Sequence, residues 1–209
     1  MFAYCNNNPV ASADPSGEYG GHQPIMVCDN TPPLAICEAV RESKNYKKKA
    51  NCYAYAFNIT VDPRTGEPFQ TMPQPGDFSG KYCTPDLEGF WATLEKDHYA
   101  NTQGVRENII GAAKADGKIL GFTIEEVSSA NWPTNNGQWV VALGFGYNEK
   151  GFCDYHWWRR TESGLWFHKV GDASVSLLDA SYNYIHDPQE CKRGVYDHFF
   201  GYFLVTPTN

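Results

Sequence analysis

The feature that most constrains the fold is a series of five strand-like segments in the second half of the 209-residue chain. Aromatic and β-branched residues are frequent in each segment, and turn residues separate them, which predicts short strands. The turns at 148–151 and 161–164 are short and contain glycine, as expected of hairpins. The predicted strands are 118–127, 138–145, 152–160, 165–170 and 198–205.

The first half has a different pattern, with apolar residues at helical spacing and a proline-rich loop at 62–85. We expect a helix that runs from Asn51 to Asn58, in which Cys52, Tyr55 and Ala56 share a face. The other predicted helices are 34–44, 86–99 and 105–115. Because 42% of the residues are hydrophobic, the chain can bury a core. The fold expected is α+β, with N-terminal helices followed by an antiparallel β-meander.

The N-terminal segment carries Tyr4, then Asn7-Asn8-Pro9-Val10 and then Asp14-Pro15-Ser16-Gly17. This spacing resembles the end of the repeat-associated core of RHS polymorphic toxins. The resemblance implies that residues 1–20 end that core, that 21–33 form a linker and that 34–209 form the effector domain. It also implies export within a larger RHS protein, because the first residues lack the layout of a signal peptide. The RHS shell and an immunity protein are the partners implied.

Three residues could form a catalytic constellation. Cys52 stands at the start of its predicted helix, and His156 and His168 lie on strands joined by the 161–164 turn. A thiol attacks as its thiolate, and a nearby imidazolium and a helix N-terminus both lower the pKa of a thiol. The histidine returns the proton to the leaving group, and a third polar residue fixes its tautomer. We therefore expect Cys52 as nucleophile, His156 as base, His168 as orienting residue and a lowered thiol pKa.

This order of a helix cysteine, a strand histidine and a polar residue on the next strand resembles papain-like enzymes, and specifically the NlpC-type cysteine peptidases. Pro75-Gly76-Asp77 is similar to the Pro-Gly-Asp that lies between cysteine and histidine in that family. Two features depart from it: the long stretch between Asp77 and His156, and Asn51 where an Asp is usual. The resemblance implies a papain-like domain with peptidase or amidase activity and with neither a cofactor nor a metal.

Alternatives remain at each position of the site. Cys52 could be an inert core residue. Zinc could bind Cys153, His156 and His168, although no HExxH or CxxC spacing supports this. Seven cysteines leave at least one thiol without a disulfide partner. The orienting residue could instead be one of three polar residues that follow the histidines, namely Asp172, Asp179 or Asn183.

The activity expected is hydrolysis of a protein or peptide substrate, with deamidation or transglutamination as other outcomes of the same acyl-enzyme. A non-catalytic target-binding module is the second hypothesis, and the aromatic residues of the strands would then form its binding face. A net charge of −7 argues against a nuclease and a nucleic-acid partner. No Gly-rich nucleotide loop supports an ADP-ribosyltransferase. No apolar stretch approaches the length of a membrane span, and a secreted effector is expected.

Overall fold

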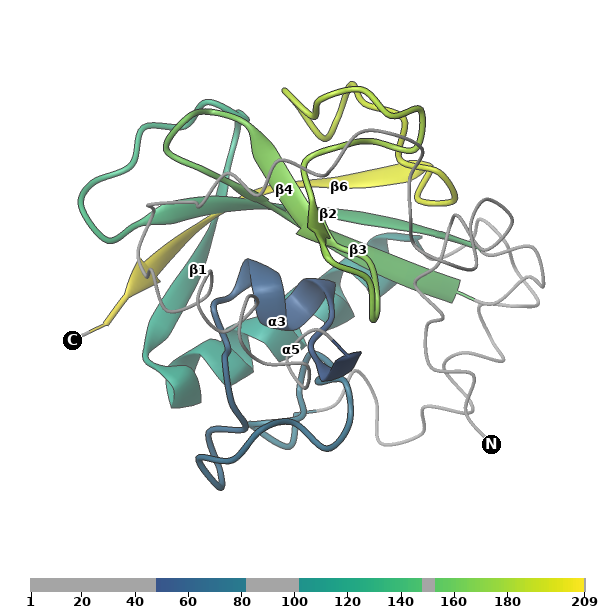
Figure 1. The fold of residues 1–209 in the computed structure, drawn as a ribbon. Coiled ribbons are helices and arrows are strands. Elements are labelled where there is room, and N and C mark those ends of the chain that lie inside the picture. Colours follow the sequence, from purple (N-terminus) through teal and green to yellow (C-terminus); the bar gives the residue numbers. More distant parts are fainter. Residues whose placement is uncertain (1–47, 82–101, 148–152, 209) are drawn as a thin grey trace.

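A mixed α+β structure is seen in the computed structural model, which describes residues 48–81, 102–147 and 153–208. Within these ranges the helices α3 and α5 lie on one face of a six-stranded antiparallel sheet (Figure 1). The helices are α3 (Cys52–Ala56) and α5 (Thr102–Leu120). The strands are β1 (Phe122–Val127), β2 (Trp139–Tyr147), β3 (Cys153–Arg160), β4 (Trp166–Lys169), β5 (Val175–Ser176) and β6 (His198–Pro207).

The order of strands in the sheet corrects the expected meander. Strands β2 to β5 do follow one another, but β6 lies between β1 and β2, so that the order is β1-β6-β2-β3-β4-β5. The reason is burial. Strand β2 is buried along almost its whole length and therefore needs a neighbour on each side, whereas β1 exposes Thr123, Glu125 and Glu126 as an edge strand. Strand β6 provides the second neighbour that β2 needs and leaves β1 at the edge, because it pairs with β2 on one side and with β1 on the other.

The two predicted helices that fall within the described ranges are present. Helix α3 matches the prediction for 51–58, and α5 contains the predicted 105–115 but extends further at both ends. Residues 118–120 were expected to begin a strand and instead form the last turn of α5. Gly121 follows with φ of 82°, the left-handed conformation in which a glycine ends a helix at little cost. Its conformation separates α5 from β1.

The two faces of the sheet are covered differently. On the helix side, α3 and α5 pack against inward-facing residues of β1, β2, β3 and β6 in one large apolar cluster. On the other side, the long connection between β5 and β6 folds over the sheet (Figure 1). It supplies Ile185 and Tyr196 to a second cluster that contains Trp158 and Trp166. The backbone N–H of Trp166 also donates to Ile185 O at 2.9 Å, which attaches this connection to β4.

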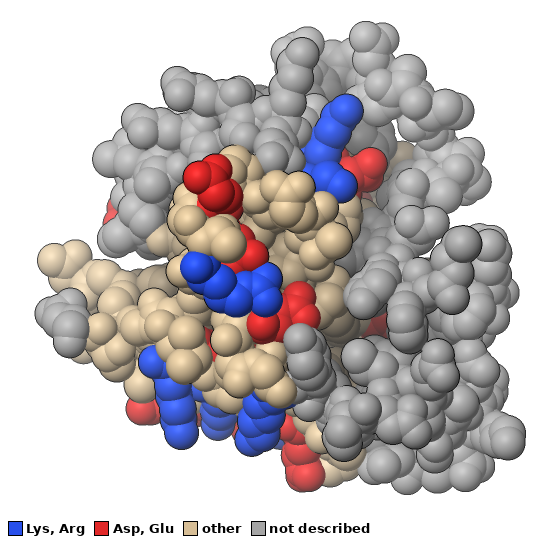
Figure 2. All heavy atoms as spheres, turned by 90° about the horizontal axis from the view of Figure 1, so that it is seen from below, with Lys and Arg blue, Asp and Glu red and all other residues tan. Residues whose placement is uncertain are grey.

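Several expectations lie outside the described residues: the N-terminal segment 1–20, the linker 21–33, the helices at 34–44 and 86–99, and the turn at 148–151. Residues 62–81 of the proline-rich loop contain no helix or strand. None of the helices in the described ranges is long and apolar enough to cross a bilayer. Figure 2 shows a face on which the described Lys and Arg side chains stand beside Asp and Glu side chains.

Candidate functional site

Cys52 is the first residue of α3 and is fully buried. Asn51 begins the helix as its N-cap, because its Oδ1 accepts a hydrogen bond from Ala54 N at 3.1 Å. The Nδ2 of Asn51 donates to Pro73 O at 2.8 Å and so attaches the following loop. The predicted nucleophile therefore stands at a well-capped helix start, as the sequence predicted.

The thiol of Cys52 lies against the main chain of β3. Its Sγ is 4.0 Å from the carbonyl oxygen of Tyr155. Strand β4 pairs β3 only at residues 158–160, so Tyr155 lies in the part of β3 beyond the end of β4. Burial raises the pKa of the Cys52 thiol to about 12, against the opposing effects of the Trp157 backbone and of Lys169. The lowered pKa expected from the sequence is therefore wrong for this arrangement, in which the thiol is protonated.

His156 and His168 are brought together as the hairpin predicted. The Nε2 of His156 lies 2.8 Å from the Nδ1 of His168. Trp158 is the register partner of His168, so the two imidazoles are diagonal neighbours on one face of the sheet. The Nε2 of His168 in turn lies 2.9 Å from Leu178 O. Together these contacts form a linear hydrogen-bonded chain from β3 through β4 to the loop that follows β5.

This chain fixes the tautomer of both rings. A carbonyl oxygen only accepts, so the Nε2 of His168 carries a proton, and in the neutral ring its Nδ1 is an acceptor. The Nε2 of His156 must then donate, which leaves the Nδ1 of His156 without a proton. That atom is buried and has no hydrogen-bond partner among the described residues. The arrangement therefore leaves the Nδ1 of His156 with neither a proton nor a partner among the described residues.

Both imidazoles are neutral at physiological pH. Burial lowers the pKa of His156 well below its usual 6.5, and the neighbouring His168 lowers it further. Burial also lowers the pKa of His168 to about 4, although the Leu178 carbonyl and Asp179 act in the opposite direction. A neutral pair can accept a proton, and it does so most readily when a negative charge develops beside it.

The sheet separates the thiol from the histidine pair. Side chains alternate along a strand, and Cys52 belongs to the apolar cluster of Tyr155 and Trp157 on the helix side. His156 projects to the other side, where its ring contacts Trp158 and Tyr196. Three of the four ring nitrogens of the pair have partners other than the thiol, and the fourth, the Nδ1 of His156, has none among the described residues. The structure thus brings the two histidines together, and places Cys52 beside the backbone of the same strand.

The three alternative orienting residues lie elsewhere. Asp172 and Asn183 are exposed. Asp179 accepts backbone N–H groups of its own loop, from Ser181 and Asn183 through Oδ1 and from Lys192 through Oδ2. Of the four candidates, His168 is the one that hydrogen-bonds His156.

The zinc alternative has no support in the described ranges. No group of three or more His, Cys, Asp or Glu side chains there could hold a metal ion. Cys153 begins β3, but its side chain lies outside what the structure describes. Cys191 is the other described cysteine with a free thiol, and it is half-buried in the loop before β6.

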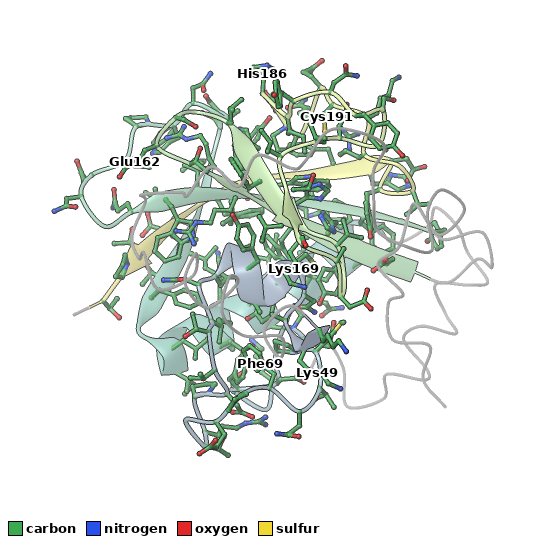
Figure 3. The ribbon with its side chains drawn as sticks, in the orientation of Figure 1. Lys49, Phe69, Glu162, Lys169, His186 and Cys191 are labelled. Carbon is green, nitrogen blue, oxygen red and sulfur yellow. The ribbon has the colours of Figure 1, made fainter. Side chains whose placement is uncertain are left out.

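Two buried charged residues near the site were missed by sequence reasoning. Lys169 on β4 points toward the helix side, beside α3 (Figure 3). Its Nζ donates to Ala50 O at 2.6 Å and to Gly171 O, which ties the start of α3 to the end of β4. The alternation of β4 was the available signal, because His168 and Lys169 must face opposite sides.

The second missed residue is Asp116 on α5, which is fully buried. Its carboxylate accepts from the Tyr53 hydroxyl at 2.9 Å and from the backbone N–H groups of the loop that contains Pro75-Gly76-Asp77. These donors are Gly76 N at 2.7 Å, Phe78 N at 3.2 Å and Ser79 N at 2.7 Å. Asp116 therefore holds this loop against α3 and α5.

Two cavities of about 430 and 390 Å³ are present at other places in the described structure. The larger has Arg106 and His198 in its wall, and the smaller has Phe57 and Trp139. Neither is lined by Cys52 or by the histidine pair. In this structure the histidine pair is covered by the loop between β5 and β6.

No family model matches the chain. It is 26% identical over 177 residues to Insoluble matrix shell protein 1 of Ruditapes philippinarum, in a match that covers 82% of this chain and 93% of that protein. No solved structure matches it significantly.

Proposed function

We propose that the domain is a papain-like, thiol-dependent acyl hydrolase, a cysteine peptidase or amidase that acts on a protein or peptide. Cys52 is the nucleophile, His156 the general base and His168 the residue that orients His156. The observation that carries the proposal is the bare Nδ1 of His156, whose tautomer is set through His168 by Leu178 O. A buried nitrogen without a hydrogen-bond partner lowers the stability of the fold. Such atoms call for an explanation, and a catalytic role is one.

The reaction follows from these atoms. The Cys52 thiol gives its proton to the Nδ1 of His156 as the sulfur bonds to the substrate carbonyl carbon, and the electron pair of the carbonyl moves to oxygen. The tetrahedral intermediate collapses, and the leaving amine takes the proton from His156. Water, deprotonated by the same Nδ1, then cleaves the thioester. It releases a carboxylic acid and restores the thiol.

The reaction requires the Sγ of Cys52 to come within hydrogen-bond reach of the Nδ1 of His156. Because the two side chains lie on opposite sides of β3, the start of α3 must move past the part of β3 that β4 leaves unpaired. The raised thiol pKa and the neutral rings correspond to a resting state in which neither group is charged. Transfer of one proton converts this state into the reactive thiolate and imidazolium.

We further propose that the domain is a delivered effector. The support is the N-terminal Asn7-Asn8-Pro9-Val10 and Asp14-Pro15-Ser16-Gly17, which resemble the end of an RHS core. In that setting the parent shell would carry the domain, and an immunity protein would protect the producing cell.

The test compares Cys52→Ala with Cys191→Ala, because Cys191 is also a free thiol and burial raises its pKa to about 12 as well. Each variant is expressed in a bacterial cell, and growth arrest is measured beside circular dichroism of the purified protein. Folded Cys52→Ala should lose all arrest, whereas Cys191→Ala should keep it. Full arrest by folded Cys52→Ala would refute the thiol mechanism.

A non-catalytic structural or binding module is the second candidate. Two observations favour it: the complete burial of the Cys52 thiol, and the similarity to a protein named as an insoluble shell-matrix component. Labelling at neutral pH with a peptide-based electrophile, which enters the substrate site, separates the candidates. The hydrolase predicts that this probe labels Cys52 faster than Cys191, and that His156→Gln removes the difference. A structural module predicts that Cys52 is labelled more slowly than Cys191 in both proteins.

A further inference from the structure

The imidazole of His156 is enclosed by two aromatic rings. Tyr196 stacks on it, with ring centroids 4.9 Å apart and planes inclined by 26°. Trp158 approaches edge-on, at 4.6 Å and 73°. The hydroxyl of Tyr196 donates to Asp154 Oδ2 at 2.9 Å, and Asp154 lies on the same strand face as His156. The tyrosine is thus held at its hydroxyl while its ring covers the imidazole.

Two glycines of β2 make room for this tyrosine. Gly144 is the register partner of His156. A Cβ at Gly144 would lie 2.9 Å from the ring of Trp158 and 3.4 Å from the Cβ of Tyr196. A Cβ at Gly146 would lie 1.7 Å from Val195 O, a contact that no real structure permits. The absence of side chains at these two positions lets the backbone before Tyr196 lie directly on the sheet.

A hydrogen bond from Nε2 to His168 constrains one atom of the His156 ring. Rotation about Cβ–Cγ in histidine has broad minima, so one contact does not fix the plane of the ring. The stacked face of Tyr196 and the edge of Trp158 occupy the space into which the ring would turn. Rotation by 180° would exchange nitrogens for carbons and break the bond to His168.

We infer that Tyr196 is a positioning residue for His156: it fixes the plane of the imidazole, and so the direction of Nδ1, while His168 fixes the tautomer. The inference rests on the proposed function where it assigns His156 a catalytic use. The statement that Tyr196 fixes the plane of the His156 ring can be tested without a substrate. The connection between β5 and β6 then has a role beyond covering the sheet, since it delivers Tyr196 to the base.

The test reads the ring of His156 directly, by nitrogen-15 NMR of the histidine side chains in the whole chain. Wild type should show one tautomer for His156, protonated at Nε2. Tyr196→Met removes the stacking face but keeps an apolar side chain, and should give mixed tautomers and a His156 titration closer to pH 6.5. Tyr196→Phe keeps the ring and should restore the wild-type signals. Tyr184→Met, at an exposed tyrosine, is the matched control and should change nothing.

Growth arrest should fall about tenfold in Tyr196→Met and recover in Tyr196→Phe. A folded Tyr196→Met with wild-type His156 signals and titration would overturn the inference. If Tyr196→Met does not fold, Gly144→Ala takes its place, because its Cβ meets the ring of Trp158 at 2.9 Å and the Cβ of Tyr196 at 3.4 Å and so displaces the aromatic enclosure without removing it. Unchanged His156 signals there have the same meaning. A failed Cys52→Ala test would refute the thiol chemistry yet leave the NMR outcome intact, so the two failures can be told apart.

Discussion

Asp116 and Lys169 on the helix face of the sheet differ from His156 on the loop face in how completely their buried polar atoms are hydrogen-bonded. On the helix face, the Asp116 carboxylate receives four hydrogen bonds and the Lys169 ammonium donates to two carbonyls. On the loop face, His156 has a buried nitrogen without a partner among the described residues. Satisfied buried groups stabilise a fold, whereas an unsatisfied one costs stability. The comparison concerns these three residues and not the whole faces, because the Nε1 of Trp157 on the helix side is also buried without a partner among the described residues. It indicates that Asp116 and Lys169 stabilise the fold, whereas the open nitrogen of His156 costs stability.

Removal of the Asp116 charge should have the largest effect on stability. In Asp116→Asn the amide can turn one oxygen toward the donors, but its NH₂ group then faces backbone N–H groups of residues 76–79. We expect the free energy of unfolding to fall by about 3–5 kcal/mol, because a buried hydrogen-bonded network is broken. Urea denaturation measures it, and Asp172→Asn, at an exposed aspartate, is the control. A loss below that of the control would show that the loop is held by other contacts.

The histidine pair should make the fold sensitive to acid. The folded-state pKa of His168 is about 4, below the unfolded value of 6.5, and that of His156 is lowered as well. In acid the unfolded chain takes up protons first, so the stability is complete above about pH 6.5 and is lost as the pH falls through about 4. For His168 the decrease in the free energy of unfolding approaches about 3 kcal/mol.

Urea midpoints at several pH values between 7.5 and 4 measure this loss. His168→Gln removes one titrating ring and should flatten the profile, while His186→Gln, at an exposed histidine, should leave the slope unchanged. A wild-type profile no steeper than that of His168→Gln would mean that the ring of His168 titrates normally.

Lys169→Met should cost less than the loss of Asp116. It leaves Ala50 O and Gly171 O without their donor, and we expect a decrease of about 2 kcal/mol in the free energy of unfolding. Lys192→Met, at an exposed lysine, is the control in the same urea experiment. Equal stability of the two variants would show that the tether between β4 and the start of α3 is not needed.

The sequence was sufficient where the signal was local. Alternation and turn residues predicted β2, β3 and β4, and the even spacing across the 161–164 turn predicted that His156 and His168 share a face. The position of β6 was not predictable in this way, because its pairing with β1 and β2 depends on residues far away in the chain. The same limit explains why the expected contact between Cys52 and His156 is absent here: a helix start can approach either face or the edge of a strand.

The burial of single polar or aromatic residues outside a regular pattern could not be predicted from the sequence either. Asp116 within an amphipathic helix is indistinguishable, by sequence, from a solvent-facing aspartate. Its burial follows from a loop that is about 40 residues away in the chain. Tyr196 lies in a long connection without periodicity, so no pattern marked it. The glycines of β2 were a usable signal, since Gly144 and Gly146 in a buried strand indicate close approach of another segment.

The smallest effect on stability is expected from the hydrogen bond between Tyr155 on β3 and Gln74 in the loop that follows α3. The Tyr155 hydroxyl donates to Gln74 Oε1, and so joins β3 to the loop held by Asp116. Tyr155→Phe and Gln74→Leu should each cost about 1 kcal/mol of unfolding free energy. If the residues act through this one bond, the double variant should cost less than the sum of the two, with a coupling of about 0.5–1 kcal/mol. Urea denaturation of all four proteins measures the coupling.

Tyr155→Phe with Gln70→Leu, at an exposed glutamine of the same loop, should give strictly additive losses of unfolding free energy. Additivity in the Tyr155 and Gln74 cycle would mean that this hydrogen bond contributes nothing, and that Asp116 and Asn51 hold the loop beside α3 without it.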